Sequence, residues 1–116
     1  MARESTKASR LRIYIGESSR YQHQPLHHAV VMKARQMGLA GATVVRGVEG
    51  YGHTNRLHSA NLLTLSGDLP IIVEVIDRAE RVDAFAAVAA DMVDHGLITV
   101  ETVDVWHYGR SETLPE

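Results

Sequence analysis

The order of strand-like and helix-like patterns along 116 residues is the feature that most constrains this fold. Residues 10–14 alternate polar and apolar side chains, and residues 42–48 are rich in Thr and Val, so both segments predict β-strands. Residues 69–76, with the sequence LPIIVEVI, predict a third strand, and residues 97–106 predict a fourth. Because a chain of this length has room for one hydrophobic core, the four strands are expected to share a sheet.

Two amphipathic helices are predicted between these strands. The first begins at Pro25, which suits the first helical position, and ends at Gly38. The second begins at Asp77, which stands three residues before a glutamate as in a capping box, and runs to His95. A loop from residue 49 to about residue 59 joins the second and third strands. The resulting order, β-α-β-β-α-β, predicts an α+β, ferredoxin-like fold with one antiparallel sheet and both helices on one face.

Several strands carry consecutive apolar residues, whereas a half-exposed strand would alternate apolar and polar positions. This is the case at residues 44–45, 71–73 and 105–106, so both faces of the sheet are expected to be buried. Two helices can cover only one face, which predicts that the second face packs against other copies of the chain in a homo-oligomer. In the alternative, long side chains cover this face within a monomer: Arg12, Tyr14 and Arg46.

Composition and charge exclude several classes of protein. The chain has no cysteine, which excludes a disulfide framework, a zinc–thiolate site and a cysteine nucleophile. Its net charge of -2 argues against a general nucleic-acid binder, because no basic excess is available to neutralise phosphates. The apolar runs are too short to insert into a membrane, and no apolar signal segment follows the polar N-terminus. These features favour a cytoplasmic protein.

No catalytic motif is visible in the sequence. It has no GxSxG elbow, no P-loop and no GxGxxG motif, so a non-enzymatic protein is expected. The charges are unevenly divided, since residues 1–58 carry nine basic against three acidic residues, a net charge of +6. The first half can therefore host an anion, unless the two halves interleave in the fold and the asymmetry averages out on the surface.

The segment from residue 46 to residue 58 is the candidate binding loop. Its glycines, at positions 47, 50 and 52, allow unusual backbone conformations and close approach of main-chain N–H groups to a ligand. Its cationic and imidazole side chains suit phosphate or carboxylate, and its tyrosine offers a flat apolar surface. The alternative is a plain hairpin connection with glycines for turning. The candidate ligand-binding residues of this segment are Arg46, Gly50, Tyr51, Gly52, His53, Arg56 and His58.

Seven histidines raise the question of a metal site, but the HExxH pattern is absent. For each histidine a surface or hydrogen-bonding role is favoured over metal ligation. His53 and His58 are the pair worth testing, because a mobile loop with two imidazoles can close on zinc or copper.

Four segments together resemble a known family: LRIYIGES, KARQMGLAGATVVRGVEGYG, RLHSANLLTLSGDLPIIVEVID and GLITVETV. They are similar to the PII-like proteins, a domain-of-unknown-function branch related to the PII nitrogen-regulatory signalling proteins, over residues 10–108. The resemblance implies a ferredoxin-like homotrimer. It also implies that the loop between the second and third strands, the T-loop, contacts partner proteins, and that adenine nucleotides bind between subunits at its base.

The resemblance also assigns residues. Gly50, Tyr51 and Gly52 match the glycine–aromatic–glycine sequence at the base of the PII T-loop, where His53 and Thr54 replace an arginine and a glutamine. The phosphate-holding loop of PII is missing between the second helix and the last strand. The uridylylated tyrosine of PII has no clear equivalent in this shorter loop. Near the C-terminus, Arg110 is the best candidate for an anion contact.

The expected function is therefore that of a non-enzymatic PII-like regulator. It would bind a small anionic ligand, foremost an adenine nucleotide, and regulate a partner such as a membrane transport protein through a short T-loop. The alternative is a metal-responsive trimer resembling the divalent-cation tolerance proteins. Residues 1–9 are expected to form a flexible tail, residues 10–108 the PII-like domain, and residues 109–116 a C-terminal tail.

Overall fold

The structure is a computed structural model, and it describes residues 5–52, 58–59 and 68–107. Four long strands, two helices and two pairs of two-residue strands occur in the described residues. In chain order the elements are β1 (Thr6–Gly16), β2 (Arg20–Tyr21), β3 (Gln24–Pro25), α1 (Leu26–Gln36), β4 (Ala42–Arg46), β5 (Glu49–Gly50), β6 (His58–Ser59), β7 (Pro70–Asp77), α2 (Ala79–Met92) and β8 (Leu97–Val105).

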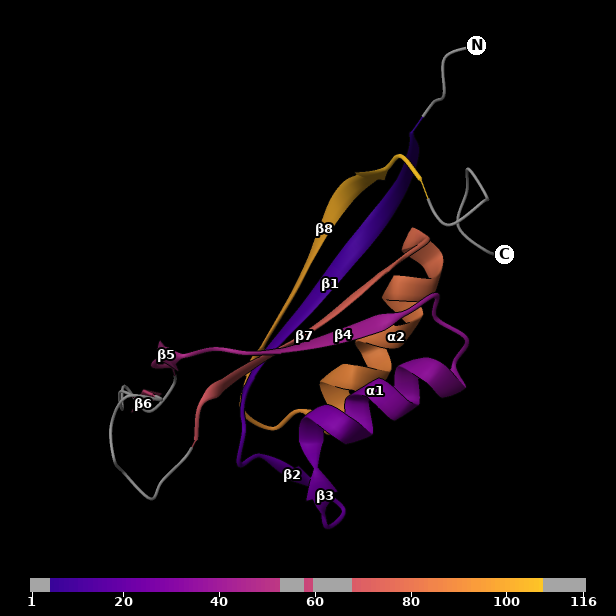
Figure 1. Ribbon diagram of the computed structural model, residues 1–116. Helices are drawn as coiled ribbons and strands as arrows, with labels where there is room; N and C mark the ends of the chain where they lie inside the picture. Colours follow the sequence, from indigo (N-terminus) through magenta and orange to yellow (C-terminus); the bar gives the residue numbers. More distant parts are fainter. Residues whose placement is uncertain (1–4, 53–57, 60–67, 108–116) are drawn as a thin grey trace.

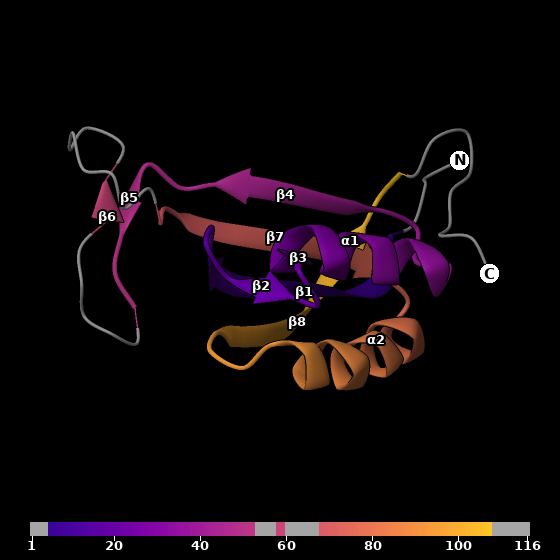
Figure 2. The same ribbon diagram turned by 90° about the horizontal axis from the view of Figure 1, so that it is seen from below.

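The long strands form one antiparallel sheet in the order β4-β7-β1-β8, so β1 and β7 are central. Both helices lie against the same face of this sheet (Figures 1 and 2). The ferredoxin-like α+β fold predicted from the sequence is confirmed. The face that carries the helices is called the helix face below, and the opposite face is called the outer face.

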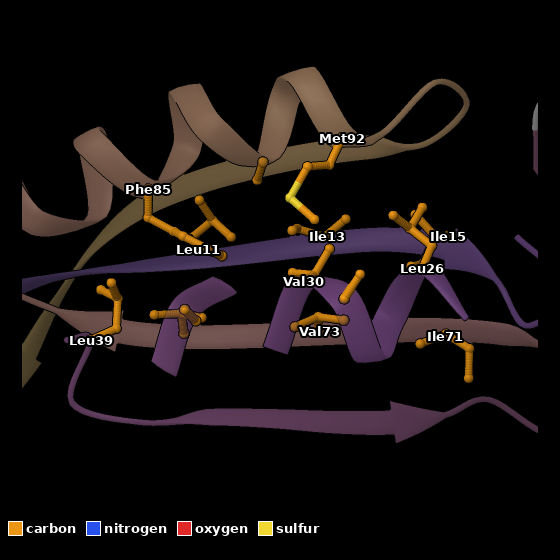
Figure 3. Packing of buried hydrophobic residues seen from close by; sticks show 14 of the residues in the cluster. Leu11, Ile13, Ile15, Leu26, Val30, Leu39, Ile71, Val73, Phe85 and Met92 are labelled. Atoms are coloured by element: carbon orange, nitrogen blue, oxygen red, sulfur yellow. The ribbon is translucent and has the colours of Figure 1, made fainter. Parts of the chain in front are cut away.

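The core lies between the sheet and the two helices (Figure 3). In β7, Ile71 and Val73 point to the helix face and are buried, whereas Ile72 between them lies on the outer face and is only partly buried. Phe85 of α2 is fully buried against this layer. The consecutive apolar residues of β7 therefore serve two different surfaces. The cluster is completed by Leu11, Ile13, Ile15, Leu26, Ala29, Val30, Ala34, Leu39, Val75, Val82, Ala89 and Met92.

The ends of several elements differ from the prediction. Pro25 is the N-cap of α1 rather than its first residue, and the chain leaves the helix through Gly38, whose φ of +81° suits glycine. The first strand begins at Thr6, four residues earlier than predicted. The reason is that Thr6 pairs with Val105 of β8, and that Ala8, two residues later, is buried. The second helix ends at Met92 instead of continuing to His95.

The predicted capping role of Asp77 is wrong. The residue is the last of β7, and its side chain makes no cap to α2, whose N-cap is Arg78. Instead, the fully buried carboxylate accepts the backbone N–H of Ala40 at 2.8 Å and the backbone N–H of Arg78 at 2.7 Å. Its Oδ2 also lies 3.8 Å from Nη1 of Arg81. Asp77 thus joins the segment after α1 to the start of α2.

The connection between β4 and β7 was predicted to be a loop, but it contains two short strands, β5 and β6. Gly50 of β5 pairs with His58 of β6, and this short ladder projects beyond one end of the sheet, away from the helices (Figures 1 and 2). None of the glycines at positions 47, 50 and 52 has a positive φ. A Cβ at Gly47 would lie 2.7 Å from the Pro70 ring, and one at Gly50 would lie 3.1 Å from it. These two glycines therefore allow the outgoing chain to pack on the first residue of β7.

Replacing Asp77 by Ala is expected to lower the free energy of unfolding by about 2–3 kcal/mol, because two N–H groups lose their acceptor. Urea unfolding followed by circular dichroism measures this change. Asp83→Ala removes an exposed carboxylate of α2 and is the matched control, with an expected change below about 0.5 kcal/mol. Equal losses in the two variants would contradict the role assigned to Asp77.

Replacing Gly47 by Ala is expected to destabilise the protein by about 1–3 kcal/mol, because the added methyl group overlaps the Pro70 ring. Combining it with Pro70→Ala should recover part of this loss. Gly52→Ala is the control, since no atom of the described part of the chain lies within 4 Å of a Cβ built there. Thermal unfolding of the three variants tests the contact, and an equal effect at both glycines would count against it.

Candidate functional site

The described part of the predicted binding loop starts at one end of the sheet. Here β4 ends at Arg46, β1 ends at Gly16, and β7 begins at Pro70. Gly16 pairs with Pro70 and Arg46 pairs with Ile71, so the three strand ends lie side by side. We call this region the loop base.

Arg46 forms an ion pair across strand β7. Its Nη2 donates a hydrogen bond to Oε2 of Glu17, the residue that follows β1. Arg46 is opposite the buried Ile71, and directly paired residues point to the same side of a sheet. Arg46 therefore lies on the helix face, and the alternative in which it shields the outer face is wrong.

The turn after β1 is tied to the returning end of the connection. The backbone N–H of Glu17 donates to the carbonyl oxygen of Leu69 at 2.8 Å, and that of Ser18 donates to Oδ1 of Asp68 at 2.7 Å. On the outgoing side, the N–H of Gly47 donates to the carbonyl oxygen of Pro70 at 2.7 Å. These hydrogen bonds fix both sides of the connection to the end of the sheet. They thereby position the side chains at the two ends of the connection.

Tyr51 is the aromatic residue of the loop base. Its side chain is 70% exposed, directly after the glycine that packs on Pro70. Among the described residues, no heavy atom lies within 4 Å of a Cβ built at Gly52, so none of them covers the backbone beside the ring. This arrangement can offer a stacking surface to a planar ligand.

The predicted site residues are only partly covered by the described chain. The structure places Arg46 at the loop base, where Gly50 packs on Pro70, and it pairs the backbone of His58 with Gly50. Tyr51 and Gly52 follow Gly50 directly in the chain. Three predicted residues, His53, Arg56 and Arg110, lie outside the described residues, as does the side chain of His58. Within the described ranges, no three His, Asp or Glu side chains gather closely enough to hold a metal ion.

Sequence reasoning missed three residues of the loop base. Glu17 and Asp68 were not among the predicted site residues, yet each accepts a hydrogen bond that fixes this region. Pro70 was assigned to a strand, but its ring decides where glycine is required. The glycines were predicted to approach a ligand, and nothing in the sequence identified Pro70 as the residue on which two of them pack.

The outer face is the second candidate functional surface. In its centre, Nε of Arg12 donates to Oε2 of Glu74 at 2.8 Å, and this hydrogen bond raises the pKa of the arginine. The apolar residues around this pair include Leu97, which is 57% exposed, and Val45, which is 49% exposed. A cavity of about 370 Å³ opens beside the pair. Its outer-face lining includes Thr43, Glu74, Ile76 and Val105.

Within the described chain, neither helix is both long enough and apolar enough to cross a membrane.

Among solved structures, the chain is similar to CPII, a nitrogen regulatory PII-like protein from Thiomonas intermedia K12 bound to ADP, AMP and bicarbonate. The TM-score is 0.63 at 17% identity, over 90% of this chain and 92% of that one. A GlnK–ATP complex from B. subtilis has a TM-score of 0.54 at 12% identity, over 84% and 82% of the two chains.

The divalent ion tolerance protein CutA1 from Ehrlichia chaffeensis has a TM-score of 0.56 at 8% identity, over 89% of this chain and 85% of that one. At these identities the three solved structures establish the shared fold and nothing more.

Among curated sequences, a UPF0166 protein of Aquifex aeolicus (strain VF5) is 35% identical over 99 residues, which cover 85% of this chain and 93% of the relative. The DUF190 family, described as "Uncharacterized ACR, COG1993", matches residues 8–105. The chain therefore belongs to the DUF190 family and has the fold of the PII-like proteins.

Proposed function

We propose that this protein is a non-enzymatic, PII-like signalling protein that binds an adenine nucleotide between the subunits of a homotrimer. Binding at the loop base changes the conformation of the short T-loop, residues 51–59, and thereby the affinity for a regulated partner. The observation that carries the proposal is the loop base itself, where an arginine and an exposed tyrosine are held by a sheet end of the PII-like fold.

The chemistry of the loop base suits a nucleotide. A guanidinium group presents a planar fork of donors that matches phosphate oxygens, and Arg46 is 62% exposed. The ring of Tyr51 offers the stacking surface that an adenine base can use. His53, Arg56, His58 and Arg110 are the further ligand contacts in this proposal. The adenine nucleotides in the CPII and GlnK structures support this choice of ligand.

The outer face supports the proposed assembly. Its exposed apolar residues surround an arginine and a glutamate that already neutralise each other, so another protein surface can cover them without an unpaired charge. A second and a third copy of the chain, packed through this face, would leave crevices between subunits. In this proposal the loop bases line these crevices, which places a ligand where it contacts two subunits.

A ligand acts as a signal only if it favours one conformation of the T-loop over another. A coupling free energy of about 1–3 kcal/mol changes the affinity for a partner by about 5- to 150-fold. We propose a protein partner, with a membrane transport protein as the foremost candidate. In this scheme the chain needs no catalytic group, because binding alone carries the signal.

Isothermal titration of the full chain with ADP, ATP and AMP tests the nucleotide part of the proposal. Saturable binding of at least one nucleotide is expected. Tyr51→Ala should weaken it about fivefold or more, because base–aromatic stacking contributes about 1–3 kcal/mol. Tyr51→Phe should retain most of the affinity, since the ring remains.

Trp106→Ala is the matched control, because it removes an exposed aromatic ring at the opposite end of the sheet. It is expected to leave the affinity unchanged. Absence of heat with all three nucleotides would reject the nucleotide part of the proposal. Equal weakening by Tyr51→Ala and Trp106→Ala would reject the location at the loop base.

A further inference from the structure

The ion pair at the loop base joins two strand ends that are not neighbours. In the sheet order β4-β7-β1, strand β7 separates Arg46 at the end of β4 from Glu17 after β1. The two side chains therefore meet over the start of β7 on the helix face. A ligand that uses the guanidinium of Arg46 must compete with this carboxylate.

The two partners differ in how firmly they are held. The Glu17 side chain is 24% exposed, and the backbone of Glu17 and Ser18 is fixed by hydrogen bonds to Leu69 and Asp68. The Arg46 side chain is 62% exposed. The carboxylate is thus the fixed member of the pair, and the guanidinium is the member that can turn toward a ligand.

We propose that Glu17 is an internal competitor for Arg46 and lowers the affinity of the site for anionic ligands. This inference rests on the proposed function, since it assigns a role within the same site. In the ligand-free protein Glu17 holds Arg46. An anion binds there only if its interaction with Arg46 outweighs the lost pair and the repulsion from the remaining carboxylate.

The difference between the two ligand classes follows from charge. A monocarboxylate replaces one carboxylate by another, so the number of ion pairs is unchanged while an additional negative charge is brought close to Glu17. A terminal phosphate has a charge of about -1.5 to -2 and three acceptor oxygens, and it binds the arginine fork in a bidentate manner. Asp68 is a further carboxylate of the loop base and adds to the repulsion of anions. Repulsion by Glu17 also grows with the charge of the ligand, so its removal is expected to help a phosphate more than a monocarboxylate.

Glu17→Gln tests this role, because it removes the charge and nearly preserves the shape of the side chain. By titration calorimetry, ADP is expected to bind about three- to fivefold more tightly to this variant than to the wild-type protein. The preference for AMP over adenosine-5′-carboxylate, which carries a single charge on the same nucleoside, should become larger, because the repulsion by Glu17 that is removed is greater for the more highly charged phosphate. The gain should vanish in an Arg46→Ala background, because no guanidinium is then left to be released.

Asp104→Asn is the matched control, since it removes one carboxylate from an ion pair with Lys7 at the opposite end of β1. It changes the net charge by the same amount as Glu17→Gln and should leave the affinities for ADP, AMP and adenosine-5′-carboxylate unchanged. Unchanged ADP affinity in Glu17→Gln, an equal gain in Asp104→Asn, or a gain that persists without Arg46 would overturn the inference while nucleotide binding stands. If neither the wild-type protein nor Glu17→Gln binds any probe, the proposed function fails and the inference fails with it.

Discussion

Burial of the sheet is the constraint on which the rest of the structure depends. The two helices cover one face, where Leu11, Ile13 and Val73 are completely buried. The outer face keeps apolar residues such as Val45 and Leu97 at the surface, around the neutralised pair of Arg12 and Glu74. In the proposed homotrimer other chains cover this face, and their arrival would turn single strand ends into crevices between subunits.

The loop base shows how a packed sheet end can present binding groups. Pro70 fixes the outgoing chain at Gly47 and Gly50, and the turn after β1 fixes the returning chain. These contacts leave Tyr51 open to solvent and hold Arg46 against Glu17. Because the base of the connection is rigid, a change in the partner of Arg46 can affect the segment beyond the base. The proposed signalling role requires this coupling.

Local patterns in the sequence were sufficient to predict the fold. The alternation in residues 10–14 and the apolar run in residues 69–76 identified the two central strands, and helical spacing identified both helices. Other features of the structure could not be predicted from the sequence, because they depend on contacts between residues that are distant in sequence. Asp77 suggested a helix cap, but the segment after α1 supplies the N–H of Ala40 to it. The partner of Arg46 was likewise set by strand order, which places Glu17 across β7.

The central claim is that the outer face assembles copies of this chain. Sedimentation velocity at micromolar concentration tests it most directly, because it measures the mass of the particle in solution. The account predicts three chains of 12.8 kDa each, a mass of about 38 kDa. A particle of 12.8 kDa across this range of concentration would contradict the account, since a single chain forms no crevice between subunits.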